Sequence, residues 1–127
     1  MGEIKDLPTE VQDCPVRDVL DRIGDQWSVL VLLSLGAGTL RFNALRRRIG
    51  DVSQHMLART LKRLEQDGLV SRTYFPVIPP RVDYALTALG RSLLAPLGQL
   101  TEWADANHER IRRARLAYRE PSAEHGA

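Results

Sequence analysis

Hydrophobic and polar positions follow a helical period in the middle of the chain, over residues 54–67. Three leucines recur there at steps of four and three residues, which places them on one side of an α-helix. These leucines are Leu57, Leu61 and Leu64. Ser53 is a suitable N-cap because its hydroxyl can accept from an amide of the first turn, and Gly68 suits the left-handed turn that often ends a helix. The pattern predicts one amphipathic helix from Gln54 to Asp67.

The opposite face of this predicted helix is polar and basic. It carries Gln54, His55, Ala58, Arg59, Lys62 and Arg63. A helix whose first turn has small or polar side chains, followed by basic ones, fits the major groove of DNA. There Gln and Arg can bond base edges, and Lys or Arg can bind phosphates. The alternative is a charged face that is only solvated.

Two segments rich in β-branched and aromatic residues follow, over residues 69–75 and 82–86. Residues 76–80 between them include three prolines, which cannot donate ladder hydrogen bonds, so we expect a hairpin whose tip projects as a loop. The tip would extend from Pro76 to Arg81, with Arg81 near the end of the arm. A helix followed by a hairpin with a basic tip is the winged form of the helix-turn-helix.

The pattern predicts three short helices ahead of Ser53. The first begins at Cys14-Pro15, with an apolar stripe of Val16, Val19, Leu20 and Ile23. Residues 27–35 are apolar on nearly all sides and predict the central core helix. Residues 39–42 predict a third strand for the hairpin. Asn43 is the expected cap of a third helix that ends at Ile49 and turns Arg46, Arg47 and Arg48 outward.

After the hairpin, Thr87 is the expected cap of a long amphipathic helix that Pro96 and Gly98 should kink or break. Its apolar seam has no obvious core of its own chain to cover, so we expect it to pair with a second copy in a two-fold dimer. The alternative is that it folds back on its own domain. The expected organisation is one winged helix-turn-helix domain, with an N-terminal arm (1–13), a core (14–87), a dimerisation helix region (88–118) and a flexible tail (119–127).

Composition and charge narrow the class of protein. A chain of 127 residues with 43% hydrophobic residues suits one folded domain and excludes general disorder. No apolar run approaches the roughly 20 residues of a membrane span, and the start MGEIKDLPTE does not resemble a signal peptide, so we expect a cytoplasmic protein. The net charge is only +2, but between residues 41 and 63 seven basic residues stand against one acid. This asymmetry favours a surface that attracts phosphates.

Several short motifs, in order, resemble the HxlR family of bacterial transcription regulators. They are Cys14-Pro15-Val16, GDQW at 24–27, RFNALR at 41–46, the helix that starts at Ser53, DGLV at 67–70, PPRV at 79–82 and YALTALG at 84–90. The resemblance covers residues 14–103, and it implies a mainly helical MarR-like winged helix dimer that binds operator DNA and represses or activates nearby genes. Many members have glycine and lysine where this chain has Asp25-Gln26. We expect that departure to affect only a part of the core far from DNA.

The only cysteine, Cys14, stands where a helix begins. Helix N-termini favour the thiolate, the form that oxidants and electrophiles attack. Some members of the similar family sense such compounds through a cysteine at this place, by alkylation or by a disulfide between subunits, which makes Cys14 a candidate redox sensor. The alternative is a structural cysteine, because Asp13 and Asp18 nearby disfavour the thiolate.

The sequence therefore predicts a homodimeric, sequence-specific DNA-binding regulator. The expected DNA-binding residues are Ser53, Gln54, His55, Arg59, Lys62, Arg63, Arg46, Arg47 and Arg81. We find no arrangement of nucleophile and base that indicates an enzyme, no ligand spacing that indicates a metal, and no sign of a cofactor. Two alternatives remain: a regulator that responds to a reversible small-molecule effector, and a winged-helix protein-interaction module that does not bind DNA.

Overall fold

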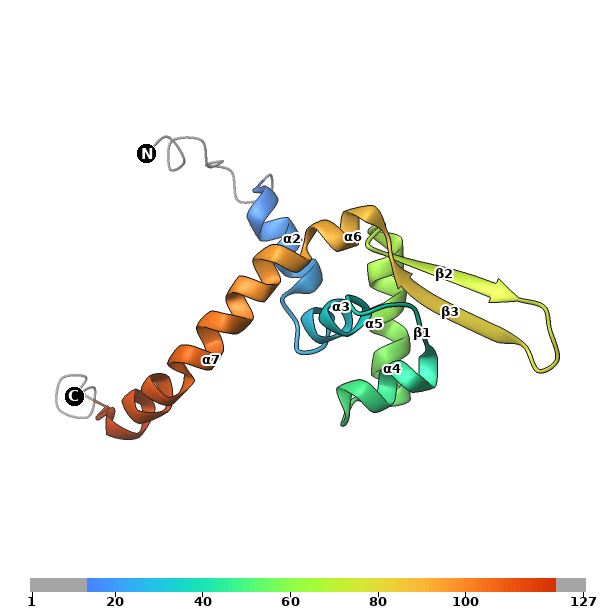
Figure 1. Cartoon of the computed structure of the whole chain (residues 1–127). Helices are drawn as coiled ribbons and strands as arrows, with labels where there is room; N and C mark the ends of the chain where they lie inside the picture. Colours follow the sequence, from blue (N-terminus) through green and yellow to red (C-terminus); the bar gives the residue numbers. More distant parts are fainter. Residues whose placement is uncertain (1–13, 121–127) are drawn as a thin grey trace. The chain divides into compact units, whose positions relative to one another are not determined.

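The computed structural model describes residues 14–120 (Figure 1). The expected N-terminal arm, 1–13, and residues 121–127 of the expected tail lie outside the described residues. The chain divides into two compact units after Ala95. The first unit holds the helices and strands of the winged helix, and the second consists of most of the last helix.

The elements follow one another in the order that the sequence predicts. They are α2 (Pro15–Ile23), α3 (Ser28–Leu35), β1 (Leu40–Arg41), α4 (Phe42–Ile49), α5 (Gln54–Gln66), β2 (Val70–Phe75), β3 (Arg81–Leu86), α6 (Ala88–Ser92) and α7 (Leu94–Ala117). The three strands form an antiparallel sheet in the order β1-β3-β2. The predicted fold class, a mainly helical winged helix-turn-helix with a small β-hairpin, is confirmed.

The core of the first unit is centred on α3, which packs against α4, α5 and β3. Val31, Leu32 and Leu35 of α3 are fully buried. The leucine stripe of α5 is also buried, as its helical spacing predicts: Leu57, Leu61 and Leu64. The β2–β3 hairpin projects beyond these helices (Figure 1). Burial of one side of α5 leaves its other side at the surface.

The third helix starts differently from the sequence prediction. Asn43 does not cap α4, because the helix already begins at Phe42, with Arg41 as an N-cap that makes no side-chain bond. The physical reason is the third strand. Arg41 pairs with Asp83 of β3, so the chain enters the helix directly from the sheet.

The apolar stripe of α2 is only partly covered. Ile23 is buried, whereas Val16, Val19 and Leu20 are each about half exposed. The first helix therefore presents an apolar face at the surface of its unit.

The expected break in the last helix lies at Leu93, between α6 and α7. Pro96 lacks the amide that would bond the carbonyl of Ser92 four residues earlier, and its ring would clash with that carbonyl. Gly98 lies inside α7 and does not interrupt it. Thr87 caps α6 as predicted, because its Oγ1 accepts from the amide of Gly90 at 3.0 Å.

Gly90 is required by a close approach of two backbones. A Cβ atom at this position would overlap the carbonyl oxygen of Leu69, which accepts a hydrogen bond from the amide of Thr87. We expect Gly90→Ala to lower the free energy of unfolding by about 1–3 kcal/mol, the usual cost of overpacking. Denaturant unfolding measures this change.

Gly98→Ala is the matched control. No heavy atom lies within 4 Å of a Cβ built there, and alanine favours a helix over glycine by about 1 kcal/mol. This variant should be neutral or more stable. Equal destabilisation by both substitutions would contradict the role of the Gly90 contact.

Candidate nucleic-acid interface

Helix α5 is held at both ends by local hydrogen bonds. Ser53 Oγ accepts from the amide of Met56 at 3.0 Å, which confirms the predicted cap. At the other end the helix stops at Gln66, one residue before the predicted end, and Asp67 is its C-cap. Gly68 adopts a φ of 76°, and the amide of Leu69 bonds the carbonyl of Leu64 at 3.0 Å. The Ser53 cap therefore fixes the start of α5, and the turn at Gly68 fixes its end.

The outward face of α5 keeps most of its predicted polar residues at the surface. The exposed ones are Gln54, His55, Ala58, Arg59 and Lys62. On the inward side Thr60 is buried, and its hydroxyl donates to the carbonyl of Met56 at 2.9 Å. The polar residues that remain outside can reach a partner without disturbing the core.

Arg63 lies on the same helix but is engaged inside the domain. Its Nη2 donates to the carbonyl of Arg22 at 3.0 Å and to Oδ2 of Asp25 at 3.2 Å. Arg46 is engaged too, because its Nε donates to the carbonyl of Val52 at 3.2 Å and so bridges the turn between α4 and α5. Arg47, by contrast, is exposed.

Asp25 is the carboxylate at the centre of these contacts. It accepts from the amides of Trp27 and Ser28 at 2.7 and 2.8 Å, and from the hydroxyl of Ser28 at 2.6 Å. Partial burial raises the pKa of Asp25, but the bonds from Ser28 and Trp27 and the charge of Arg63 outweigh it, so the pKa falls below its ordinary value. The departure at Asp25 thus reaches α5 as well as the start of α3. That residues 25–26 lie far from DNA stays a prediction.

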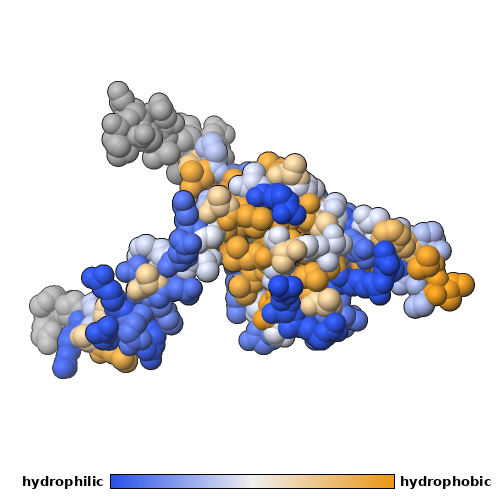
Figure 2. Space-filling model, viewed as in Figure 1, coloured by the Kyte–Doolittle hydropathy of each residue, from blue (hydrophilic) through white to orange (hydrophobic). Residues whose placement is uncertain are grey.

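The wing differs from the predicted basic tip. Arg81 is the first residue of β3, opposite Phe75, and not part of the loop. Its Nε lies 3.3 Å from Oδ1 of Asp83, and its guanidinium carbon lies 4.3 Å from the centre of the Phe75 ring. The loop itself exposes Val77 and Ile78, and Figure 2 shows hydrophobic side chains at the outer end of the hairpin. Arg81 therefore lies at the base of the loop and not at its tip.

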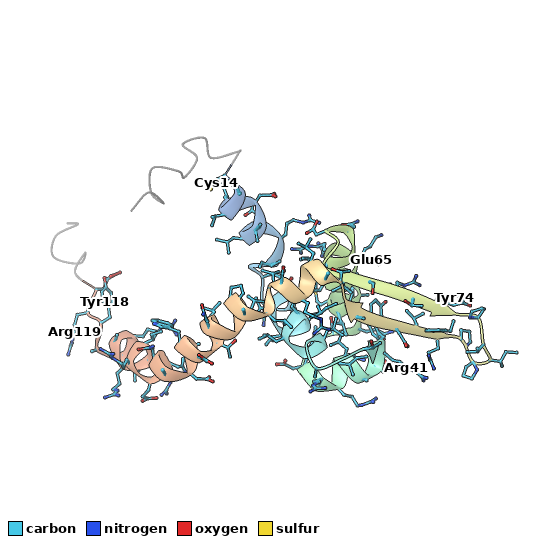
Figure 3. The ribbon with its side chains drawn as sticks, turned by 45° about the horizontal axis from the view of Figure 1, so that its top comes forward. Cys14, Arg41, Glu65, Tyr74, Tyr118 and Arg119 are labelled. Atoms are coloured by element: carbon cyan, nitrogen blue, oxygen red, sulfur yellow. The ribbon has the colours of Figure 1, made fainter. Side chains whose placement is uncertain are left out.

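A cleft of about 400 Å³ lies between this end of the sheet and α4. Arg41, Arg47 and Arg81 line it together with Asn43. Figure 3 shows Arg41 at the start of α4. Sequence reasoning did not include Arg41 among the site residues, although the predicted third strand was the signal that would have placed it beside β3. Three arginines from β1, α4 and β3 thus surround one cleft.

Cys14 is the N-cap of α2, next to Pro15 at the first helical position. Its side chain makes no capping hydrogen bond and is partly exposed. Figure 3 places it at the outer end of α2. Cys14 is therefore neither fully buried nor engaged as a side-chain cap.

Residues 14–120 contain no group of three or more His, Cys, Asp or Glu side chains arranged to hold a metal ion. Within the same residues, no helix has the length and apolar character needed to cross a membrane.

Comparison with known proteins identifies the family. A model of HxlR-like helix-turn-helix proteins matches residues 22–112. The chain belongs to the HxlR-like helix-turn-helix family. The resemblance drawn from the ordered motifs is thereby confirmed, and the family consists of transcriptional regulators and not of enzymes.

Individual HxlR-like relatives can be aligned with most of the chain. The uncharacterized HTH-type transcriptional regulator YtfH of Escherichia coli K12 is 43% identical over 105 residues, which are 83% of each protein. The solved structure of the putative regulator ytfH from Salmonella typhimurium is 40% identical, with a TM-score of 0.77 over 87% of this chain and 99% of that one. The redox regulator HypR in its reduced form is 36% identical, with a TM-score of 0.74 over 78% of this chain and 98% of that one.

Proposed function

We propose that this HxlR-like protein is a homodimeric, sequence-specific DNA-binding transcription regulator that places α5 in the major groove. The observation that carries the proposal is the division of α5 into a buried leucine side and an exposed polar side. Gln54 and Arg59 are suited to bidentate bonds with base edges, and His55 adds a third polar group near the start of the helix.

The phosphate contacts of this interface come from two places. Lys62 lies on α5 itself, and the cleft between the wing and α4 adds Arg41, Arg47 and Arg81. Arginine binds phosphate oxygens through two parallel N–H groups, and cations from separate elements can fix the register of a duplex. We therefore replace Arg46 and Arg63 in the predicted set by Arg41, since each of those two guanidiniums hydrogen-bonds a backbone carbonyl. Arg81 stays in the set because its ion pair with Asp83 includes no hydrogen bond and its side chain lines the cleft.

The dimer of this proposal uses the apolar surfaces that each unit leaves exposed. In the first unit these include Val16, Val19 and Leu20 of α2, and in the second they include Leu100 and Trp103 of α7. Burial of apolar side chains between two copies is favourable, and a two-fold dimer matches a palindromic operator. The expected dimerisation region, residues 88–118, contains the α7 surface.

The regulator needs a signal, and Cys14 is our first candidate. Two observations favour it: Cys14 is partly exposed at the start of α2, and a solved relative is a redox regulator. Because the sequence has one cysteine, Cys14 cannot form a disulfide within one chain, so any disulfide joins it to a second copy or to another thiol. The alternative, a reversible small-molecule effector, has a cavity of about 610 Å³ between α2 and α6, within the size range of ligand sites.

Fluorescence anisotropy with DNA from the region upstream of the gene, and random DNA as competitor, tests the interface. Arg59→Ala should cost about 1–3 kcal/mol of specific binding, because a base contact is lost. Lys62→Ala should weaken binding to all sequences alike and lower the salt slope by about 1. Arg115→Ala removes the same charge from the last turn of α7 and is the control, with little change expected. Equal losses on both DNAs for Arg59→Ala would refute its base-reading role.

The thiol switch is tested by the same binding assay after mild diamide treatment. We expect oxidation to release wild-type protein from specific DNA and to leave Cys14→Ser bound, because serine cannot form a disulfide. Mass spectrometry should show a Cys14–Cys14 link or a mixed disulfide in the wild type only. Release of the Cys14→Ser variant as well would rule out this switch, and wild-type binding that survives diamide would favour the small-molecule effector.

A further inference from the structure

Two ion pairs cross between the end of α2 and the end of α5. Arg22 of α2 donates through Nε to Oδ2 of Asp67, the C-cap of α5, at 2.8 Å. In the opposite direction, Arg63 of α5 donates to Asp25, just after α2, at 3.2 Å. Each side of the contact supplies one cation and one anion. The hydrogen bond with the Asp67 carboxylate and its negative charge raise the pKa of Arg22.

Asp25 joins a third helix to the same point. Its Oδ1 accepts from the amides of Trp27 and Ser28, which open α3. Arg63 also donates to the carbonyl of Arg22 in the last turn of α2. The last turn of α2, the first turn of α3 and the second half of α5 therefore meet at one carboxylate and one guanidinium.

These bonds fix the rotation of α5 about its axis, which the buried leucines alone do not fix. Apolar contacts are non-directional and tolerate small rotations and shifts of a helix, whereas charge-assisted hydrogen bonds set both distance and angle. Arg63 lies one helical turn after Arg59, so the two residues share a side of α5. A small rotation of α5 at Arg63 would move Arg59 in the same sense.

We propose that Arg63 and Asp25 form a positioning link that sets the orientation of α5 in the groove, and that Arg63 does not itself bind DNA. This inference rests on the proposed function. The crossed pair Arg22–Asp67 supports the same orientation from the other side. Both bonds of Arg63 come from Nη2, so its guanidinium is oriented toward Asp25 and the carbonyl of Arg22.

A positioning role and a phosphate-binding role of Arg63 predict opposite changes in DNA affinity for one substitution, Asp25→Asn. Asp25→Asn keeps a carbonyl oxygen for the amides of Trp27 and Ser28 but removes the negative charge that holds Arg63. If Arg63 positions α5, this variant should bind specific DNA roughly three- to tenfold more weakly, with binding to random DNA and the salt slope unchanged. If Arg63 binds phosphate, the variant releases it and should bind all DNA more tightly.

Asp21→Asn is the matched control. It removes the same charge from an exposed position of α2 that takes part in no ion pair among the described residues, and it should leave the preference for specific DNA unchanged. Thermal unfolding of each variant checks that the fold is retained.

The test is completed with Arg63→Gln and the double variant Asp25→Asn with Arg63→Gln. A positioning link predicts that both single variants lose specificity to a similar extent and that the double variant is no worse than either. An unchanged ratio of specific to random binding in the single variants would overturn the inference, as would a lowered salt slope in Arg63→Gln. Wild-type protein without any preference for specific DNA would contradict the proposed function itself.

Discussion

The structure depends on the packing of α5 against α3. Helix α3 is apolar nearly all round, so it can receive α4, α5 and β3 at once, and its Val31, Leu32 and Leu35 are fully buried. The leucine stripe of α5 is only one side wide. Its burial therefore decides which residues face outward. Because the leucine side packs on α3, the opposite, polar side of α5 lies at the surface.

The elements with a strong local signal could be predicted from the sequence. The period of the leucines, the Ser53 cap and the turn at Gly68 define α5 to within one residue, because all three depend on neighbours along the chain. The hairpin and the third strand follow in the same way from their β-branched and aromatic residues. Asn43 shows the limit of such local rules. Asparagine favours the cap position, but the pairing of Arg41 with β3 starts the helix at Phe42, one residue before Asn43.

The partners of the long charged side chains could not be predicted. A guanidinium can reach acceptors from several elements, and the pattern along the chain does not say which elements meet. Arg63 looked like a groove residue because it shares a face with Arg59, yet the α2–α3 corner supplies its acceptors. Arg46 likewise bonds Val52, and Arg81 pairs with Asp83. Of the basic residues between positions 41 and 63, those that remain exposed include Arg41, Arg47, Arg59 and Lys62.

The claim that α5 reads the major groove is tested most directly by a dimethyl sulfate footprint on DNA to which the protein binds specifically. This reagent methylates N7 of guanine in the major groove. Insertion of α5 from each copy of a two-fold dimer should protect guanines in two half-sites about one helical turn apart. Specific binding that leaves every guanine N7 of the site reactive, in a site that contains guanines in both halves, would contradict the claim.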